Sequence, residues 1–162
     1  MTRSRRPGHA ALLTPALLIP ALLGLAACGP ERPKQVVQVT QYNDGKGVPL
    51  YVSSDAGKLT GAPKDFQSFI RFTVRTAIEG DDGSCDEPPV YTVLTISAAF
   101  GAGELSQCGV KKLVWAKTDG KWSQVLAYDG EPACDDLTAK GVPPGITGPS
   151  CRDDEGSRPY QG

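Results

Sequence analysis

The sequence predicts a small disulfide-bonded domain of the α+β class, in which one main helix packs on an antiparallel sheet. Three observations support this prediction. Residues 63–79 place apolar side chains at the three- and four-residue steps of one helix face. Two strand-like runs, 110–118 and 121–128, are separated only by Asp119-Gly120, and four cysteines follow the helix. A chain of 162 residues is long enough for one such domain.

The main helix is expected to begin at Pro63, because proline fits the first helical position, and to end before Gly80. Asp65 lies in its first turn, where a negative charge is favourable. Polar and basic side chains occupy one side, so the helix should bury the opposite side against a sheet. That apolar side consists of Phe66, Phe69, Ile70, Val74, Ala77 and Ile78.

The strongest strand signal is Asp119-Gly120, because both positions of a tight hairpin turn need positive φ. This turn sets Thr118 opposite Lys121. With regular strands, Leu113 then falls opposite Leu126. One face of the hairpin should therefore contact the helix, and it contains Leu113, Trp115, Trp122, Leu126 and Tyr128.

Three further runs have strand character, 35–40, 48–52 and 90–100, the second of them at a sheet edge because it contains Pro49. The resulting order of strand, helix and three antiparallel strands resembles the α+β roll of cystatin-like and NTF2-like domains, in which a curved sheet wraps one helix. Such rolls serve many unrelated functions, so the resemblance implies no activity.

Two glycine-containing triplets, 45–47 and 101–103, are predicted to be turns, and residues 132–141 predict one short helix closed by Gly141. Residues 115–143, which run from the Trp-Ala-Lys-Thr-Asp-Gly-Lys-Trp segment through a cysteine to a proline, are similar to a group of secreted lipoproteins of high-GC Gram-positive bacteria. This resemblance covers part of the chain and carries no activity with it.

The first 27 residues have the layout of a secretory signal peptide, with a basic start and an uncharged apolar run from Ala10 to Ala27 that ends in small residues. A retained membrane span is the alternative, because the run approaches the roughly 20 residues that cross a bilayer. Pro15 and Pro20 would each remove a backbone donor from that helix, which favours the signal peptide.

The segment Leu25-Ala26-Ala27-Cys28 resembles the lipobox of bacterial lipoproteins. The resemblance implies diacylglyceryl transfer to the Cys28 thiol, cleavage after Ala27, and a mature chain held on the extracytoplasmic face of the cell membrane. Two acyl chains hold a protein firmly where one chain gives only marginal binding. The alternative is an ordinary signal peptide whose cleavage site happens to precede a cysteine.

The mature chain is expected to have three parts. Residues 28–34 are a short polar linker with two prolines, residues 35–151 form a single α+β domain, and residues 152–162 are a flexible polar tail. Removing the leader takes away three arginines and no acid, leaving 14 basic against 18 acidic residues and a net charge of −4. This balance argues against nucleic-acid binding and against a polybasic membrane patch.

Apart from Cys28, the chain has four cysteines, and an even number in an exported domain predicts two disulfides. Three connectivities are possible. We favour Cys134 with Cys151, because a short helix and a Gly-Pro reversal lie between them, which leaves Cys85 with Cys108. A strand separates the latter two, so the loops at its ends must fold back for that pair to form. The sequence contains no Cys-x-x-Cys pair, so the cysteines give no indication of a zinc site or of redox chemistry.

The sole histidine, His9, lies in the leader, so the mature chain lacks the histidine of Ser-His-Asp, Cys-His and common zinc sites. No phosphate-binding or dinucleotide motif is present, and no cofactor or resident metal is expected.

The acidic loop 81–87 is oxygen-rich enough to suggest Ca²⁺, but it lacks the alternating acids of an EF-hand and is expected to be a solvated loop. Asp135-Asp136 is expected to serve the dipole of the short helix.

The expected function is that of a cell-envelope lipoprotein whose domain binds an envelope protein, a wall polymer or a small ligand without catalysis. The alternative is a small carboxylate-dependent hydrolase acting on an envelope polymer, because Asp and Glu alone can cleave glycosides. Trp115 and Trp122 are the side chains most easily mistaken for a polymer-binding site. We expect Trp115 to lie in the core beneath the helix, whereas the sequence leaves Trp122, beside the turn, either buried or exposed.

Overall fold

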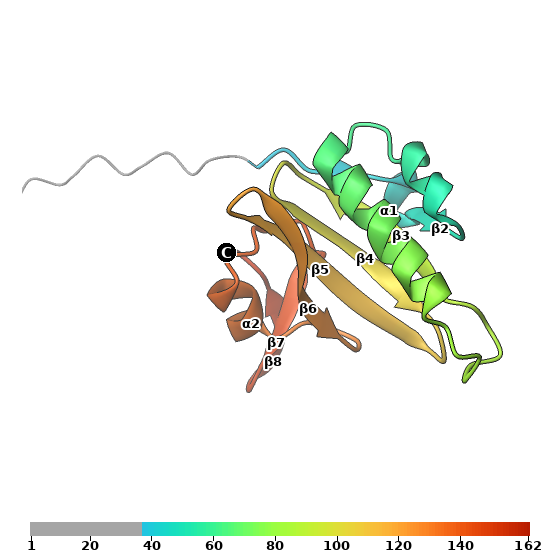
Figure 1. Ribbon diagram of the computed structural model, residues 1–162. Coiled ribbons are helices and arrows are strands. Elements are labelled where there is room, and N and C mark those ends of the chain that lie inside the picture. The colour runs from blue at the N-terminus through green and yellow to red at the C-terminus, as the bar shows by residue number, and fades with distance from the viewer. Residues whose placement is uncertain (1–36) are drawn as a thin grey trace, which may run out of the picture. The chain divides into compact units, whose positions relative to one another are not determined.

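An antiparallel sheet organises residues 37–162, the part of the chain that the computed structural model describes (Figure 1). The main helix α1 (Lys64–Glu79) lies against one face of this sheet. The α+β class with one main helix is therefore confirmed, whereas the leader, the lipobox with Cys28 and the linker 28–34 lie outside the described residues. The sheet has six strands, β1 (Thr40–Gln41), β2 (Val48–Leu50), β3 (Val90–Ile96), β4 (Phe100–Ser106), β5 (Val110–Thr118) and β6 (Lys121–Tyr128).

All neighbouring strands of the sheet are antiparallel, in the order β1-β3-β4-β5-β6. β2 also pairs with β3, opposite residues 91–93, whereas β1 pairs with residues 95–96 of the same strand. Within residues 37–162, no helix combines the length and apolar character needed to cross a membrane. The smaller elements are the 3₁₀ helices η1 (Asn43–Gly45) and η2 (Ser53–Lys58), the helix α2 (Cys134–Ala139), and a two-stranded sheet of β7 (Ser150–Asp153) and β8 (Gly156–Pro159).

The helix α1 ends before Gly80, as predicted, but it begins at Lys64, so Pro63 is its N-cap and not its first helical residue. Of the predicted apolar face, the three positions Phe66, Ile70 and Val74 are fully buried. Phe69 and Ala77 pack against the same core, whereas Ile78 is 38% exposed. The buried stripe is thus narrower than the apolar pattern and runs down the centre of the predicted face.

Two tryptophans of the β5–β6 hairpin complete this core. Phe66 contacts both indoles edge-on, with ring centroids 5.7 Å from Trp115 and 4.8 Å from Trp122. An ion pair between Asp65 and Lys117 joins the first turn of α1 to β5, and this pair holds the pKa of the Asp65 carboxyl below its usual value. Helix and hairpin are therefore joined by aromatic packing inside and by charge at the rim.

The hairpin register agrees with the sequence at the turn and departs from it further along. Thr118 lies opposite Lys121, as predicted, with positive φ at both turn positions. A β-bulge then shifts the pairing, so that Leu126 lies opposite Val114 and not opposite Leu113. Because a one-residue shift moves side chains to the other face, Leu126 and Tyr128 point away from α1, which corrects the predicted apolar face.

Residues 90–100 form no single strand, contrary to prediction. β3 ends at Ile96, and the chain reverses at Ser97, whose hydroxyl accepts a hydrogen bond of 2.9 Å from the Phe100 N–H before β4 begins. The triplet 101–103 is consequently strand and not turn. The triplet 45–47 does form a turn, as predicted, and both of its glycines have positive φ.

The glycines of β4 are explained by close packing. A Cβ atom on Gly103 would lie 2.6 Å from the Trp115 ring and would also collide with the Thr92 carbonyl oxygen. A Cβ atom on Gly101 would lie 2.8 Å from Ile96. These positions need the absence of a side chain, and not the φ freedom that glycine brings to turns.

At the N-terminal end, the predicted strand 35–40 is wrong in extent. Of its described residues only Thr40 joins the sheet, together with Gln41, opposite Ile96 and Thr95. The piece predicted over 48–52 is a true edge strand, β2, which ends at Leu50.

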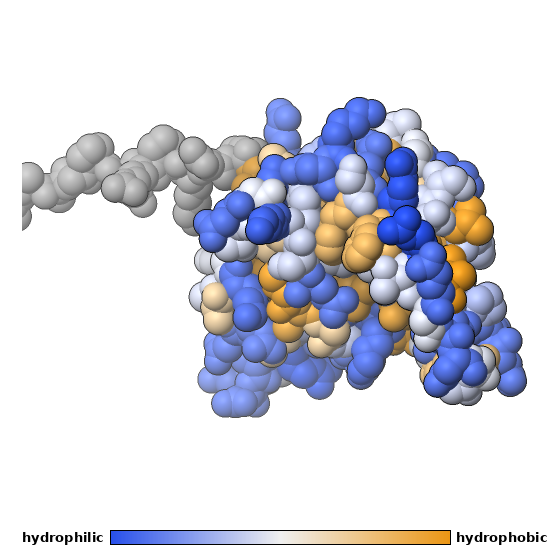
Figure 2. Space-filling model, viewed as in Figure 1, coloured by the Kyte–Doolittle hydropathy of each residue, from blue (hydrophilic) through white to orange (hydrophobic). Residues whose placement is uncertain are grey.

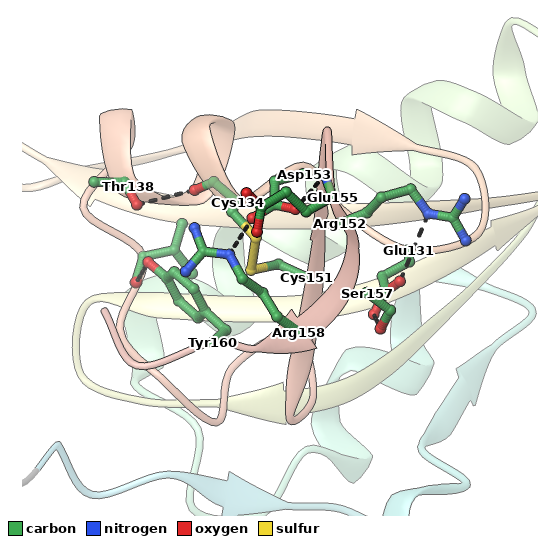
Figure 3. Close-up of a disulfide and its surroundings, with 11 residues drawn as sticks. Glu131, Cys134, Thr138, Cys151, Arg152, Asp153, Glu155, Ser157, Arg158 and Tyr160 are labelled. Atoms are coloured by element: carbon green, nitrogen blue, oxygen red, sulfur yellow. Dashed lines mark hydrogen bonds and ion pairs between the residues drawn. A yellow bond between two sulfur atoms is a disulfide. The ribbon is translucent and has the colours of Figure 1, made fainter.

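The C-terminal residues are ordered, so the predicted flexible tail over 152–162 is wrong. β7 and β8 form a hairpin that contains Cys151 and covers residues 150–159 (Figure 3). The Arg152 N–H donates a hydrogen bond of 2.8 Å to the Pro132 carbonyl, and the Tyr160 hydroxyl donates one of 2.6 Å to Val142. The predicted short helix is present as α2.

These C-terminal elements cover the face of the sheet opposite α1. A second core forms there between the sheet residues Ala102 and Val114 and the covering residues Leu137, Val142 and Ile146. Both disulfides have the predicted connectivity. Cys134 pairs with Cys151 inside the second core, with 5.0 Å between Cα atoms, and Cys85 pairs with Cys108 across the loops that flank β3 and β4, with 5.3 Å.

We predict that Gly103→Ala destabilises the domain by about 1–3 kcal/mol, because the added methyl group overpacks the contact with Trp115 and Thr92. Gly57→Ala is the matched control. No atom lies within 4 Å of its added Cβ, so this change should be neutral or slightly stabilising. Urea unfolding with the disulfides intact measures both, and equal stability of the two variants would contradict the packing described.

Candidate functional site

The face of the sheet opposite α1 has one row of polar side chains. The row crosses four strands in register, because Thr92 pairs with Glu104, Glu104 with Lys112, and Lys112 with Tyr128. Directly paired residues point to the same face of a sheet. Four polar side chains therefore lie side by side on β3, β4, β5 and β6.

The C-terminal segment 145–148 lies beside this row and closes a cleft of about 200 Å³. The hydroxyl of Thr95 donates a buried hydrogen bond of 2.7 Å to the Ile146 carbonyl, which attaches the segment to β3. Beneath the segment the sheet presents Ala102 and Gly103, so no bulky side chain fills the space. The other residues lining the cleft include Gln41, Glu104, Lys112, Tyr128 and Thr147.

Several polar groups of this cleft have no partner within the described residues. The Thr147 hydroxyl oxygen is buried and makes no hydrogen bond there. Glu104 and Lys112 are half-buried and directly opposite each other, yet neither belongs to any ion pair of residues 37–162. Buried polar groups are normally paired, so the buried Thr147 hydroxyl indicates room for a polar partner, whereas the half-exposed Glu104 and Lys112 side chains can be hydrated.

The electrostatics of the cleft favour a neutral phenol on Tyr128. Burial, and secondarily the negative charge of Glu104, raise the pKa of Tyr128 to about 12. The Tyr128 hydroxyl is therefore a neutral hydrogen-bond donor and acceptor at any physiological pH.

Glu131, beyond the end of β6, is a carboxylate that is already satisfied. The Ser157 hydroxyl donates a hydrogen bond of 2.7 Å to it, and Arg152 lies 3.7 Å from its second oxygen. Hydrogen bonds from Ser150 and Ser157 are the main reason why the pKa of Glu131 is lowered, and the positive charge of Lys112 adds to them. Glu131 thus belongs to the disulfide-bonded C-terminal region shown in Figure 3.

The buried carboxylate of Asp55 has a structural role. Its Oδ2 accepts hydrogen bonds of 2.9 and 3.2 Å from the N–H groups of Tyr51 and Val52, and its Oδ1 lies 2.9 Å from Lys58 Nζ. The bond from Lys58 and these backbone bonds lower the pKa of Asp55. All of its partners belong to the start and end of η2, so the carboxylate stabilises that turn.

The two tryptophans are core residues. Trp115 is fully buried, and its indole nitrogen has no hydrogen-bond partner within the described residues. Trp122 is 8% exposed, and its indole beside Asp65 helps to lower the pKa of that carboxyl. This confirms the expectation for Trp115 and decides the open alternative for Trp122. Neither ring is available to stack on a polymer.

The acidic loop 81–87 closes on itself. Asp81 accepts hydrogen bonds from the Gly83 N–H and from the Gln107 side chain, and Asp82 accepts one from the Ser84 N–H. Within residues 37–162 no group of three His, Cys, Asp or Glu side chains is placed to hold a metal ion. Asp135 and Asp136 lie in the first turn of α2, as predicted.

Two other surface features are less suited to specific recognition. One hollow, of about 690 Å³, is lined by residues such as Val37, Pro63 and Ile96, and none of its lining residues is ionisable. On the face in Figure 2, hydrophobic side chains lie in several separate groups among hydrophilic ones. Scattered exposed apolar side chains are normal on a protein surface.

The cleft was missed by the sequence analysis for an identifiable reason. Taking 101–103 as a turn hid β4, and with it the register that sets Glu104 opposite Lys112. β4 gives no period-two signal that could have marked Glu104, because residues 101–103 are all buried and residues 104–106 are all half-buried.

Comparisons of the chain with protein-family models, with curated proteins and with solved structures found no significant match.

An alkaline titration tests the environment of Tyr128. Because its folded pKa of about 12 lies above the unfolded value near 10, burial of this neutral phenol stabilises the fold fully below pH 10. That contribution is lost as the pH rises through 12. We expect phenolate absorbance to show a late-titrating tyrosine near pH 12 that is absent in Tyr128→Phe. Removal of an early-titrating tyrosine instead would contradict the buried site.

Proposed function

We propose that this chain is a lipid-anchored protein of the cell envelope, whose domain binds a ligand on the extracytoplasmic side of the membrane without catalysis. Anchoring rests on the sequence Leu25-Ala26-Ala27-Cys28 behind a basic and then apolar leader. The two disulfides support an oxidising compartment, because cytosolic chains rarely keep such pairs.

The single observation that supports binding is the cleft between the sheet and segment 145–148. Its polar groups converge on a space of about 200 Å³ and are not used up by contacts among the described residues. A small polar ligand fits this combination better than a wall polymer does, because the aromatic rings that would stack on sugars are buried. The net charge of −4 on the mature chain disfavours a nucleic acid.

Hydrolysis of an envelope polymer is the second candidate, and the cleft supports it less. Glycoside hydrolysis usually takes two carboxyl groups on opposite sides of the bond that breaks. Of the residues that line the cleft in the described part of the chain, only Glu104 has a carboxylate. This is why binding stands first in the proposal.

Anchoring is tested by replacing the acceptor thiol. In a bacterial host that processes lipoproteins, Cys28→Ala should abolish labelling by a fatty-acid analogue, and the protein should leave the detergent phase. Ala27→Gly keeps a small residue before the cysteine and should label like the wild type. An unlabelled Cys28→Ala protein that still partitions into detergent would show a retained span instead.

Binding is tested by blocking the cleft. Gln41 is exposed at its edge, so Gln41→Trp should cover the opening, whereas Gln124→Trp adds the same bulk at an exposed site elsewhere. After incubation with envelope extract, native mass spectrometry should show an added small-molecule mass on wild type and Gln124→Trp. That mass should be absent from Gln41→Trp. Its absence from all three proteins would contradict the binding proposal.

A further inference from the structure

We propose that the cleft binds a small zwitterion, a molecule that carries one ammonium and one carboxylate group, as a free amino acid does. The inference rests on the binding function proposed above and names the chemical class of its ligand. It does not depend on the lipid anchor.

The charges of the cleft are the first argument. Glu104 and Lys112 have opposite charge, are directly paired across β4 and β5, and are both half-buried. Paired side chains on one sheet face start about 5 Å apart at their Cβ atoms, yet these two form no ion pair with each other. A ligand ammonium beside Glu104 and a ligand carboxylate beside Lys112 would satisfy both charges at once.

The surroundings of Lys112 support this assignment. The positive charge of Lys112 contributes to lowering the pKa of Glu131, but Glu131 already has Arg152 at 3.7 Å and a hydrogen bond from Ser157. Lys112 is therefore not needed to neutralise Glu131. Its ammonium is available to an anionic group of a ligand in the cleft.

A ligand of a single charge would fit less well. A simple anion beside Lys112 would lie close to the Glu104 carboxylate, and a simple cation beside Glu104 would lie close to the Lys112 ammonium. Either one would leave a half-buried protein charge repelled or unpaired, which is costly where water is partly excluded. Two ligand charges of opposite sign avoid both costs.

The neutral groups and the size of the cleft narrow the class further. The Thr147 hydroxyl, buried without a partner in the described residues, and the neutral Tyr128 phenol supply hydrogen bonds that can orient a carboxylate or an ammonium. Pockets for drug-sized ligands span about 300–1,000 Å³, whereas this cleft holds about 200 Å³. The ligand is thus a molecule of amino-acid size.

The test uses full-length protein in detergent and isothermal titration calorimetry with each protein amino acid and D-alanine. We expect at least one of them to bind with a Kd of about 1 mM or tighter. Its N-acetyl derivative, which lacks the ammonium, and its amide, which lacks the carboxylate, should each bind at least about tenfold more weakly.

Two variants assign the charges. Glu104→Gln should abolish the preference for the free amine over the N-acetyl form, and Lys112→Gln should abolish the preference for the carboxylate over the amide. Lys121→Gln, at an exposed position beside the hairpin turn, is the control and should keep both preferences. Circular dichroism spectra and melting temperatures that match the wild type would show that the variants are folded.

The possible failures are distinguishable. If no amino acid binds, or if both derivatives bind as tightly as the parent, the zwitterion assignment is overturned. In that case, a small-molecule mass that is present on the wild type and absent from Gln41→Trp would show that the cleft binds a ligand of another class. If that mass is also missing from the wild type, the binding function itself fails together with the ligand class.

Discussion

The contact on which this fold depends is the packing of the Trp115 indole against Gly103 in the neighbouring strand. A side chain at position 103 would come within 2.6 Å of the ring, so β4 leaves the space that the indole occupies. The ring then lies flush enough with the sheet for Phe66 of α1 to meet it edge-on, at 5.7 Å. Burial of an aromatic side chain of this size is among the largest single contributions to a domain core. The position of α1 follows from it.

The same residue determines the opposite face of the sheet. Because Trp115 points toward α1, its neighbour Val114 points away. The bulge at Val125 in β6, opposite these two residues, turns Leu126 and Tyr128 to that second face as well. Without a cover, this apolar surface would be exposed to water. The C-terminal chain supplies the cover through Leu137, Val142 and Ile146. The C-terminal residues look like a polar tail in the sequence, yet they are ordered because the side chains of β5 point alternately to the two faces of the sheet and the second face needs a cover.

The sequence analysis succeeded where the signal is local. The helix 63–79 follows from its own periodicity, the β5–β6 turn from Asp119-Gly120, and the disulfide connectivity from what lies between Cys134 and Cys151. It failed where the deciding partner is distant in sequence. Glycines at 101 and 103 resemble a turn until Ile96 is known to pack against the first and Trp115 against the second. The bulge that shifts the β5–β6 pairing leaves no local pattern either. The candidate cleft depends on both features, which explains why its residues were not foreseen.

The Cys134–Cys151 disulfide connects the proposed location of the protein with the geometry of its cleft. Its 17-residue separation encloses segment 145–148, and closing a loop of this length restricts the unfolded chain by about 3 kcal/mol. The covering segment is then held in two ways. The disulfide joins the elements on either side of it, and the hydrogen bond from Thr95 to Ile146 attaches the segment itself to β3. A chain that remained in a reducing compartment would lose the first attachment and keep only the second. Export, as proposed from the leader, therefore provides the oxidising conditions under which the disulfide forms and segment 145–148 is held beside the cleft.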